Sequence, residues 1–290
     1  MQPPNLYHVD AFTLEPFSGN PAAVAILDAP ADAGWMQRFA DDMNLSETAY
    51  VVRPTGEGKD GDAWGLRWFT PAAEVELCGH ATLSSAHILW DEGLVDGDEP
   101  IAFTTQRSGR LTCTRDPNGL ISMDFPAQPP RPAEAPAVVL DATRVDPVAS
   151  YRSQHDWILE LASPQAVVDA RPDFQALGEA PDTRGVAITA AGCLPDGPTD
   201  ATGREADFVS RFFAPSLRVE EDPVTGSLHC ELGPMWSARL DRPDLIGHQC
   251  SRRGGLVHVT HAAPDADRVT LAGHAITLVA GVVTQPVVPA

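Results

Sequence analysis

The sequence predicts an α+β fold built from two similar units, and three observations support this prediction. The chain has 290 residues, which is long for one compact core and sufficient for two. Its apolar residues fall into many short, strand-sized runs with few helical patterns between them, which favours barrels or sandwiches over a doubly wound parallel sheet. A similar order of residue types also occurs once in each half of the chain.

The first half contains strand patterns and one amphipathic helix. Trp35, Met36, Phe39 and Ala40 recur at helical spacing, which predicts a helix over residues 32–43. Glu47 follows at the junction between this helix and the next strand, where side chains often point into a cleft. The expected strands are residues 6–12, 22–27, 48–52, 64–69, 101–105, 111–115 and 120–124.

A proline-rich segment separates the two halves. Residues 126–136 contain five prolines and few large apolar residues, which is typical of a linker. The strands expected after it are residues 157–161, 185–189, 207–213, 255–260, 269–273 and 275–283.

The repeated pattern joins a strand, an acidic loop and a glycine. The first copy reads RWFTP at residues 67–71 and CGHAT at 78–82, and the second reads RFFAP at 211–215 and TGS at 225–227. Acidic residues lie between the two blocks in both copies. The pattern predicts two copies of one structural unit, with chance as the alternative explanation for so short a match.

Two further segments predict buried helices that begin at the repeated glycines. Residues 81–90 and 227–238 are rich in small and apolar residues, although Pro234 should kink the second helix. Gly79 and Gly226 precede them, and a helix N-terminus offers unpaired N–H groups to a carboxylate or a developing enolate. Two ordinary helix starts are the alternative interpretation.

Composition excludes several classes of partner. The net charge of −20 and a pI near 4.6 disfavour nucleic acids and anionic membranes. No run approaches the roughly 20 apolar residues of a membrane helix, and no Lys or Arg precedes Arg38, so we expect a cytoplasmic protein. Lys59 is the single lysine and lies in a loop rich in Gly and Asp, which disfavours Schiff-base chemistry.

The cysteines indicate neither disulfides nor a metal. The chain has five, an odd number, and none forms a C-x-x-C pair or matches a zinc template. Most are therefore expected to be small buried residues.

Four blocks of sequence together resemble the phenazine-biosynthesis isomerase family (PhzF-like), whose fold is shared with diaminopimelate epimerase. The blocks are GNP at 19–21, NLSET at 44–48, CGHAT at 78–82 and EDPVTGS at 221–227. The resemblance implies two pseudo-symmetric domains, each a β-barrel wrapped around a central helix, with the active site between them. The first domain would be residues 1–127, joined by the C-terminal strand 275–290, and the second residues 128–274.

The same resemblance implies an isomerase that moves a proton on a small organic acid, which is cyclic in the family's type member, without a metal or organic cofactor. It assigns the acid/base role to Glu47, and His80 and Asp222 are the other expected catalytic residues. A carboxylate can serve both as base and as acid if burial raises its pKa toward the working pH. The residues expected to bind substrate are Gly19, Asn20, Cys78, Gly79, Thr225, Gly226 and Ser227.

Each assignment has a structural alternative. Glu47 could be a surface or capping residue, Asp222 a turn cap and Ser227 an ordinary residue of the first helical turn. His80 could be a structural hydrogen-bond donor near a helix start. Arg252 or Arg253 could face an anionic substrate or lie on the surface.

Cys78 carries the main competing chemistry. In the epimerase branch of this fold two cysteines act as a base and acid pair, and Cys78 holds the first place, where a helix start would favour its thiolate. Thr225 holds the second place and cannot act in this way, which excludes a two-thiol racemase. The favoured interpretation is that Cys78 is a small packed residue. A one-thiol racemase, epimerase or dehydratase of an amino or hydroxy acid stays open, as does a non-catalytic protein that binds small acids. A homodimer is expected.

Overall fold

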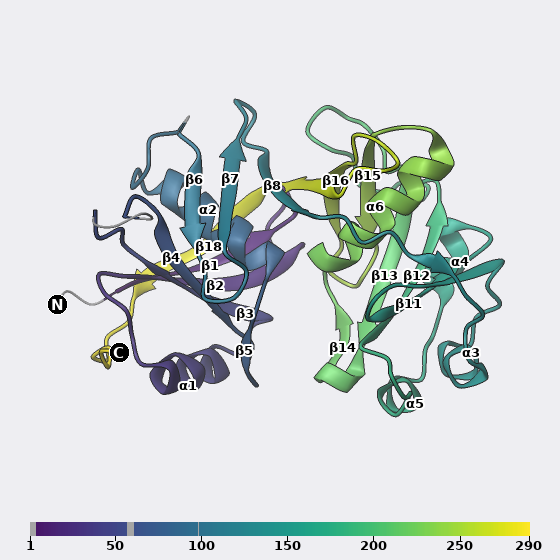
Figure 1. Ribbon diagram of the computed structural model, residues 1–290, viewed down its shortest axis with the longest axis horizontal. Coiled ribbons are helices and arrows are strands. Elements are labelled where there is room, and N and C mark those ends of the chain that lie inside the picture. The colour runs from purple at the N-terminus through teal and green to yellow at the C-terminus, as the bar shows by residue number, and fades with distance from the viewer. Residues whose placement is uncertain (1–3, 57–60, 98) are drawn as a thin grey trace. The chain divides into compact units, whose positions relative to one another are not determined.

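The computed structural model describes residues 4–56, 61–97 and 99–290, and within it the chain divides into two compact units (Figure 1). Unit 1 comprises Met1–Asp124 and Ala272–Ala290, and unit 2 comprises Phe125–Leu271. The C-terminal strand thus belongs to the same unit as the N-terminus. Lys59 lies outside the described residues.

Unit 1 is a sheet with two helices. Strand β1 pairs antiparallel with β2 and β18, β2 runs parallel to β3, and β3 is antiparallel to β4. Strand β4 is antiparallel to β5 and parallel to β6, which is antiparallel to β7. The elements are β1 (Asn5–Ala11), β2 (Asn20–Leu27), α1 (Ala33–Met43), β3 (Glu47–Val52), β4 (Trp64–Phe69), β5 (Glu74–Val75), α2 (Gly79–Asp91), β6 (Ile101–Thr104), β7 (Arg110–Arg115) and β18 (Ala275–Val282).

Unit 2 repeats this order of strand directions. Strand β10 is antiparallel to β11, β11 parallel to β12, β12 antiparallel to β13, and β13 antiparallel to β14 and parallel to β15, which is antiparallel to β16. The elements are β9 (Arg131–Pro132), α3 (Ala137–Thr143), β10 (Ala149–Arg152), β11 (Asp156–Glu160), α4 (Pro164–Asp169), α5 (Phe174–Gly178), β12 (Gly185–Ala191), β13 (Phe208–Ala214), the 3-10 helix η1 (Pro215–Leu217), β14 (Val219–Asp222), α6 (Gly226–Leu240), β15 (Asp244–Gln249) and β16 (Gly255–Thr260). Strands β8 (Ile121–Pro126) and β17 (Arg268–Gly273) contain the points where the chain passes from one unit to the other.

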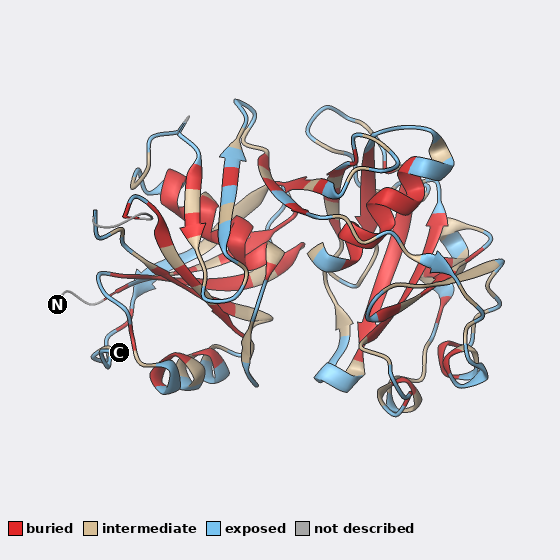
Figure 2. Ribbon diagram, viewed as in Figure 1, coloured by how far each residue is buried: buried red, intermediate tan, exposed pale blue. Residues whose placement is uncertain are grey.

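Helices α2 and α6 are buried on nearly all sides, which is why their sequences lack a polar face (Figure 2). Helix α2 contacts β1, β2, β3 and β18, and α6 contacts β15 and β16. Pro234 lies inside α6, and Gly233 beside it lets Val259 approach so closely that a Cβ at this glycine would lie 2.4 Å from Val259 Cγ1.

Helix α1 covers one side of the unit 1 sheet with an aromatic cluster. Asp32 caps its start by accepting a hydrogen bond from Trp35 N, and Asn44 ends it in the left-handed conformation. The buried Trp35 packs edge-on against Tyr50, whose hydroxyl donates to the Met36 carbonyl at 2.6 Å. Helix α1 ends at Met43, and Glu47 is the first residue of β3.

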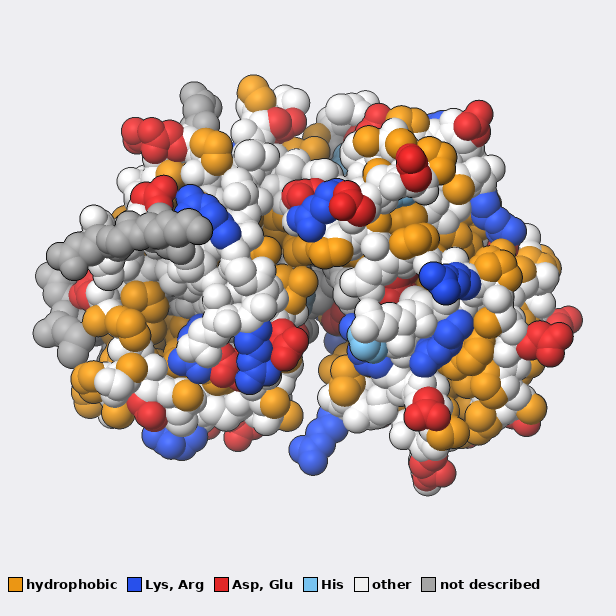
Figure 3. Space-filling model, viewed as in Figure 1, with side chains coloured by type: hydrophobic (Ala, Val, Ile, Leu, Met, Phe, Trp, Pro, Cys, Tyr) orange, Lys and Arg blue, Asp and Glu red, His pale blue; other side chains and the backbone are white. Residues whose placement is uncertain are grey.

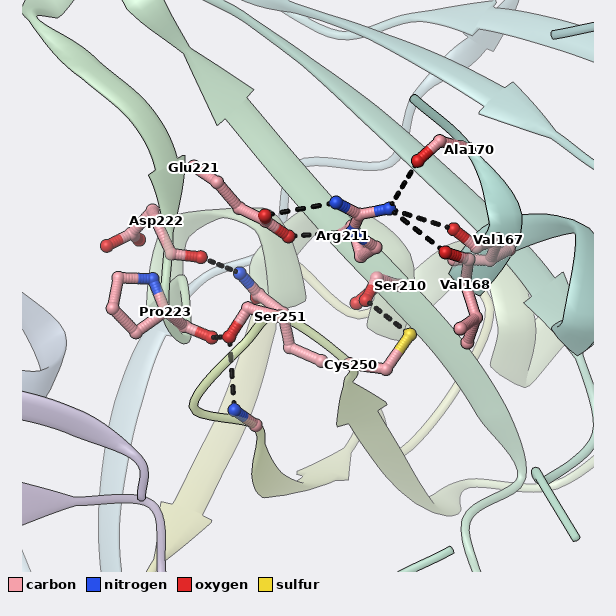
Figure 4. A network of polar contacts seen from close by, with 12 residues as sticks. Val167, Val168, Ala170, Ser210, Arg211, Glu221, Asp222, Pro223, Cys250 and Ser251 are labelled. Carbon is pink, nitrogen blue, oxygen red and sulfur yellow. Dashed lines mark hydrogen bonds and ion pairs between the residues drawn. The ribbon is translucent and has the colours of Figure 1, made fainter. Parts of the chain in front are cut away.

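The repeated sequence pattern is a repeated structure. In unit 1 Arg67 donates to both carboxylate oxygens of Glu74 across the β4–β5 pair, at 2.7 and 2.8 Å. In unit 2 Arg211 donates to both oxygens of Glu221 across β13–β14, at 2.7 and 3.0 Å (Figure 4). Each guanidinium also lies over the Phe two residues later in its strand. These equivalent contacts favour a repeated structural unit over chance as the explanation of the sequence pattern.

Several elements lie outside the sequence expectations. Strands β10, β14 and β15 and helices α3, α4 and α5 were not expected, because each is short or lies among prolines and charged residues. The proline-rich segment 126–136 belongs to unit 2 and contains β9, which pairs with β10. On the face drawn in Figure 3, acidic and basic side chains are interspersed with hydrophobic ones. No helix in the described part of the chain has both the length and the apolar character that crossing a bilayer requires.

Candidate active site

Three side chains of unit 1 converge at the start of α2. His80 Nε2 lies 3.0 Å from Glu47 Oε2. The Cys78 sulfur lies 3.5 Å from His80 Nδ1 and 4.0 Å from its Nε2. Cys78 and His80 are buried, whereas the Glu47 side chain keeps 17% of its exposure, so solvent or a ligand can reach the carboxylate.

The local fold explains this convergence. Glu47 opens β3 and pairs with Ala22 of the parallel neighbour β2. Cys78 is the N-cap residue of α2 in an extended conformation, so the following Gly79 and His80 form the first turn. Gly79 thus opens α2, where backbone N–H groups have no partner within the helix.

Burial and charge set the protonation of this cluster. Burial raises the pKa of the Cys78 thiol, and the negative charge of Glu47 raises it further. This corrects the expectation that the helix start favours a Cys78 thiolate, because desolvation outweighs that effect. Burial opposes the charged form of His80, but the negative charges of Cys78, when ionised, and of Glu47 outweigh it and hold the His80 pKa well above its ordinary value.

In unit 2 Asp222 is held against the start of α6. Its Oδ2 accepts a hydrogen bond of 2.5 Å from the hydroxyl of Thr225, the N-cap residue of α6. The Gln249 side chain accepts from Thr225 N at 2.8 Å and donates to the Asp222 carbonyl at 2.7 Å. Asp222 therefore does act in a local turn, as its alternative interpretation predicts, and its side chain is only half-buried.

Ser227, in the first turn of α6, lies beside an arginine. Its Oγ is 3.4 Å from Arg184 Nη2. The same guanidinium donates through Nε and Nη2 to both carboxylate oxygens of Asp156, which is fully buried. Arg184 also lies over the Phe212 ring, with 5.8 Å between its Cζ and the ring centroid. Gly226, which opens α6, lies next to this pair.

The strand registers show which positions of the two units correspond. Thr48 pairs with Phe69 in unit 1, and Val186 pairs with Phe213 in unit 2. Glu47 therefore corresponds to Gly185, where a Cβ would lie 2.3 Å from Phe212 Cζ. At this position of the repeated unit, only unit 1 carries a carboxylate.

The remaining expected residues have other surroundings. Gly19 has φ +67°, and a Cβ there would lie 2.1 Å from the Ala11 carbonyl oxygen. Asn20 is fully buried at the start of β2. Arg252 is exposed and Arg253 is half-buried in the loop after β15. In that loop it is Ser251 that contacts the Asp222 segment, by donating to the Pro223 carbonyl at 2.8 Å (Figure 4).

Arg184, Asp156, Gln249 and the buried Glu231 are polar residues near these helix starts that the sequence motifs do not include. Arg184 and Asp156 are isolated charges at the ends of predicted strands, and nothing in their spacing shows that they pair. Glu231 could have been recognised from the sequence, since it is an acidic residue inside an otherwise apolar helix. Gln249 could be found only from the β15 pairing.

One cavity of unit 1 lies away from the three converging side chains. It has a volume of about 340 Å³ in unit 1 and is lined by Met36, Tyr50, Leu66 and Arg67 among others. Glu47, Cys78 and His80 do not line it. We therefore locate the candidate site by its converging chemical groups.

Comparison with known structures first defines the class of protein. A PhzF-family protein of Enterococcus faecalis has a TM-score of 0.85 with 36% identity, covering 98% of this chain and all of that one. A probable proline racemase of Agrobacterium radiobacter shares the fold, with a TM-score of 0.58 and 13% identity over 98% of this chain and 93% of that one. The fold is thus the mixed α/β fold of PhzF proteins, epimerases and proline racemases.

Sequence comparison then defines the family. The family model described as phenazine biosynthesis-like protein, PhzC-PhzF, matches residues 9–281. An uncharacterised isomerase of Halalkalibacterium halodurans is 42% identical over 94% of this chain and 96% of its own length. Another, of Pseudomonas aeruginosa, is 44% identical over 95% of this chain and 96% of its own. The chain belongs to the PhzC-PhzF family and is an enzyme of the isomerase and epimerase class.

Proposed function

We propose that the protein is a cofactor-independent isomerase that moves a proton on a small organic acid, with Glu47 as the acid/base. The observation that carries this proposal is the contact between Glu47 Oε2 and His80 Nε2, at 3.0 Å. A half-buried carboxylate fixed by a buried imidazole is oriented and remains reachable by substrate. That arrangement suits a group that takes a proton and returns it.

A single carboxylate acting on one face of the substrate is consistent with the presence of Glu47 in unit 1 and of Gly185 at the matching position in unit 2. Gly185 holds the place in unit 2 that Glu47 holds in unit 1, so the repeat does not supply a second acid/base at that position. His80 keeps the Glu47 carboxylate in place, and Asp222 holds a polar group of the substrate. We therefore favour suprafacial transfer, in which one carboxylate serves both carbons.

The start of α6 provides groups for the acid function of the substrate. Gly226 and Ser227 lie in the first helical turn, and the Arg184 guanidinium is fixed beside Ser227 Oγ. Gly79, in the first turn of α2, provides the matching N–H groups for an enolate that develops during proton transfer. Gly19, Asn20, Cys78 and Thr225 are the other residues that we propose to bind the substrate.

Other expectations belong to this proposal. Each unit would form a β-barrel around its central helix, supported by the contacts of α2 with four strands and the burial of α6. The expected division at residues 127/128, the site between the domains, the homodimer and the absence of nucleic-acid and membrane partners stay predictions.

A second candidate function uses the thiol. Cys78 lies 3.5 Å from His80 Nδ1, so a one-thiol racemase, epimerase or dehydratase of an amino or hydroxy acid is sterically feasible. Burial raises the pKa of the Cys78 thiol, which disfavours the thiolate that this chemistry needs.

The experiment is deuterium incorporation from D2O into a panel of small cyclic unsaturated acids, amino acids and hydroxy acids, followed by NMR. The proposal predicts incorporation and a moved double bond in at least one cyclic acid, with Cys78→Ser lowering the rate far less than Glu47→Gln. Loss of exchange in Cys78→Ser would favour the thiol mechanism. A folded wild-type protein that exchanges no compound would favour a binding role.

A further inference from the structure

The cavity of about 340 Å³ in unit 1 lies between the sheet and the segment that contains α1. Its lining is largely apolar and includes Met36 of α1, Tyr50 and Val52 of β3, and Arg67 of β4. Tyr50 and Arg67 are paired in the register of β3 and β4, so their side chains lie on the same face of the sheet. Glu47 does not line this cavity, so the proposed function gives it no role.

The structural repeat shows which contact is missing beside this cavity. In unit 2 the equivalent arginine, Arg211, binds its glutamate through Nε and Nη2, and its Nη1 donates to the Val167 and Ala170 carbonyls at 3.2 and 2.9 Å (Figure 4). In unit 1 Arg67 also binds its glutamate through Nε and Nη2. Its Nη1, however, donates to no acceptor in the described part of the chain. The Arg67 side chain keeps 21% of its exposure, so an incoming molecule can reach it.

The difference between α1 and α4 explains why this donor is free. Both helices follow a strand that runs parallel to the next one, β2 beside β3 and β11 beside β12. Helix α4 has six residues, and the carbonyls at its end reach Arg211. Helix α1 has eleven, and its Gln37 side chain donates to the Thr70 and Pro71 carbonyls just after β4, at 2.9 and 3.1 Å. The cavity thus lies beside Arg67, where unit 2 has helix carbonyls.

The lining indicates the chemistry of the molecule that fits. An apolar cavity of about 150 Å³ already binds benzene, so this one has room for a single ring with a short substituent. Met36 and Tyr50 offer a sulfur and a ring to an aromatic partner. Glu74 balances the charge of Arg67, so Nη1 offers a hydrogen bond without a net charge that would attract an anion.

We infer that this cavity binds a small neutral aromatic molecule whose oxygen accepts a hydrogen bond from Arg67 Nη1. The site is separate from Glu47, and the inference does not depend on the reaction proposed above.

Acetophenone, a single ring with a neutral carbonyl, is the probe, and the methyl carbon of Met36 is the reporter. We expect the ¹³C-methyl NMR signal of Met36 to shift to saturation with a Kd of about 1 mM, while that of Met235, in α6, stays in place. Binding should be unchanged in Glu47→Gln. Loss of the Met36 shift in this variant would assign the binding to the candidate active site and overturn the inference.

Filling the cavity tests its location. Val52→Phe places a ring in the space and should abolish the Met36 shift. Val279→Phe is the matched control, because Val279 is exposed on β18 of the same unit, and it should bind like the wild type. Absence of a saturable Met36 shift in the wild type, or its persistence in folded Val52→Phe, would overturn the inference.

Removing the donor tests the ligand class. Arg67→Met should remain folded, since its ion pair is partly exposed, and should weaken acetophenone binding about tenfold. Ethylbenzene, which lacks the acceptor, should bind this variant as it binds the wild type, and benzoate should bind the wild type more weakly than acetophenone. Equal acetophenone affinity in Arg67→Met, or tighter binding of benzoate, would contradict a neutral acceptor held by Arg67.

Discussion

The Nε2 atom of His80 lies 3.0 Å from Oε2 of Glu47, and this contact joins the first turn of α2 to the first residue of β3. The pair lies within unit 1. It fixes a carboxylate that is still partly exposed, which is the property that proton transfer to and from a substrate requires.

The two equivalent Arg–Glu pairs should differ in their contribution to stability. Arg211→Met should lower the free energy of unfolding by about 3 kcal/mol, because it strands Glu221 and removes donors from the Val167 and Ala170 carbonyls (Figure 4). Arg67→Met should cost about 1 kcal/mol, because both side chains of its pair with Glu74 are more exposed. Urea unfolding measures both, and equal costs would contradict this ranking.

Gly19 should tolerate substitution much less well than another glycine with a similar backbone angle. Gly19→Ala introduces a Cβ 2.1 Å from the Ala11 carbonyl oxygen, in addition to the strain of φ +67°. We expect a loss of about 3 kcal/mol or more in the free energy of unfolding. Gly56→Ala is the matched control, since its φ is +72° with nothing within 4 Å, and it should cost about 1 kcal/mol. Similar melting temperatures for the two variants would show that the close approach is unimportant.

Glu231 should make the protein less stable as pH rises. Burial, and then the negative charge of Asp156, raise the pKa of Glu231 to about 8 in the folded protein. The unfolded chain releases this proton near pH 4.3, so the folded state is favoured most below that pH. The stabilisation is lost as pH rises from about 4.3 to about 8, by a few kcal/mol in total.

Replacing this carboxyl with a neutral amide tests that dependence. The free energy of unfolding of Glu231→Gln, measured at several pH values, should lack the part of the decline that titration of Glu231 causes. Glu220→Gln is the control, because Glu220 is exposed on β14, and it should follow the wild type. A decline that is the same in all three proteins would rule out a raised Glu231 pKa as its cause.

Much of the fold could be predicted from the sequence, because the strands carry apolar runs that end at turn residues. The strands expected at 64–69 and 255–260 match β4 and β16. Strands β10 and β14 are short and largely exposed or half-buried, so no apolar run marks them. Helices α4 and α5 have only six and five residues, too few for a clear helical period.

The candidate site could be predicted in part. The family blocks contain Glu47 and His80, and the structure brings these two together. The Arg184–Asp156 pair escaped prediction because a contact between ends of separate strands leaves no local pattern. The sequence allows Cys78 to be either a thiolate favoured by a helix start or a small packed residue, and the fold shows that it is buried, which raises its pKa.

The central claim is that Glu47 moves the proton, and the most direct measurement is the exchange rate of Glu47→Gln on whichever acid the wild type deuterates. General acid–base catalysis contributes about 10²–10⁴-fold, so we predict a fall of at least about 100-fold in a folded variant. Glu76→Gln, an exposed glutamate just before the CGHAT block, should keep the wild-type rate. Exchange by Glu47→Gln within a few-fold of the wild type would contradict the claim.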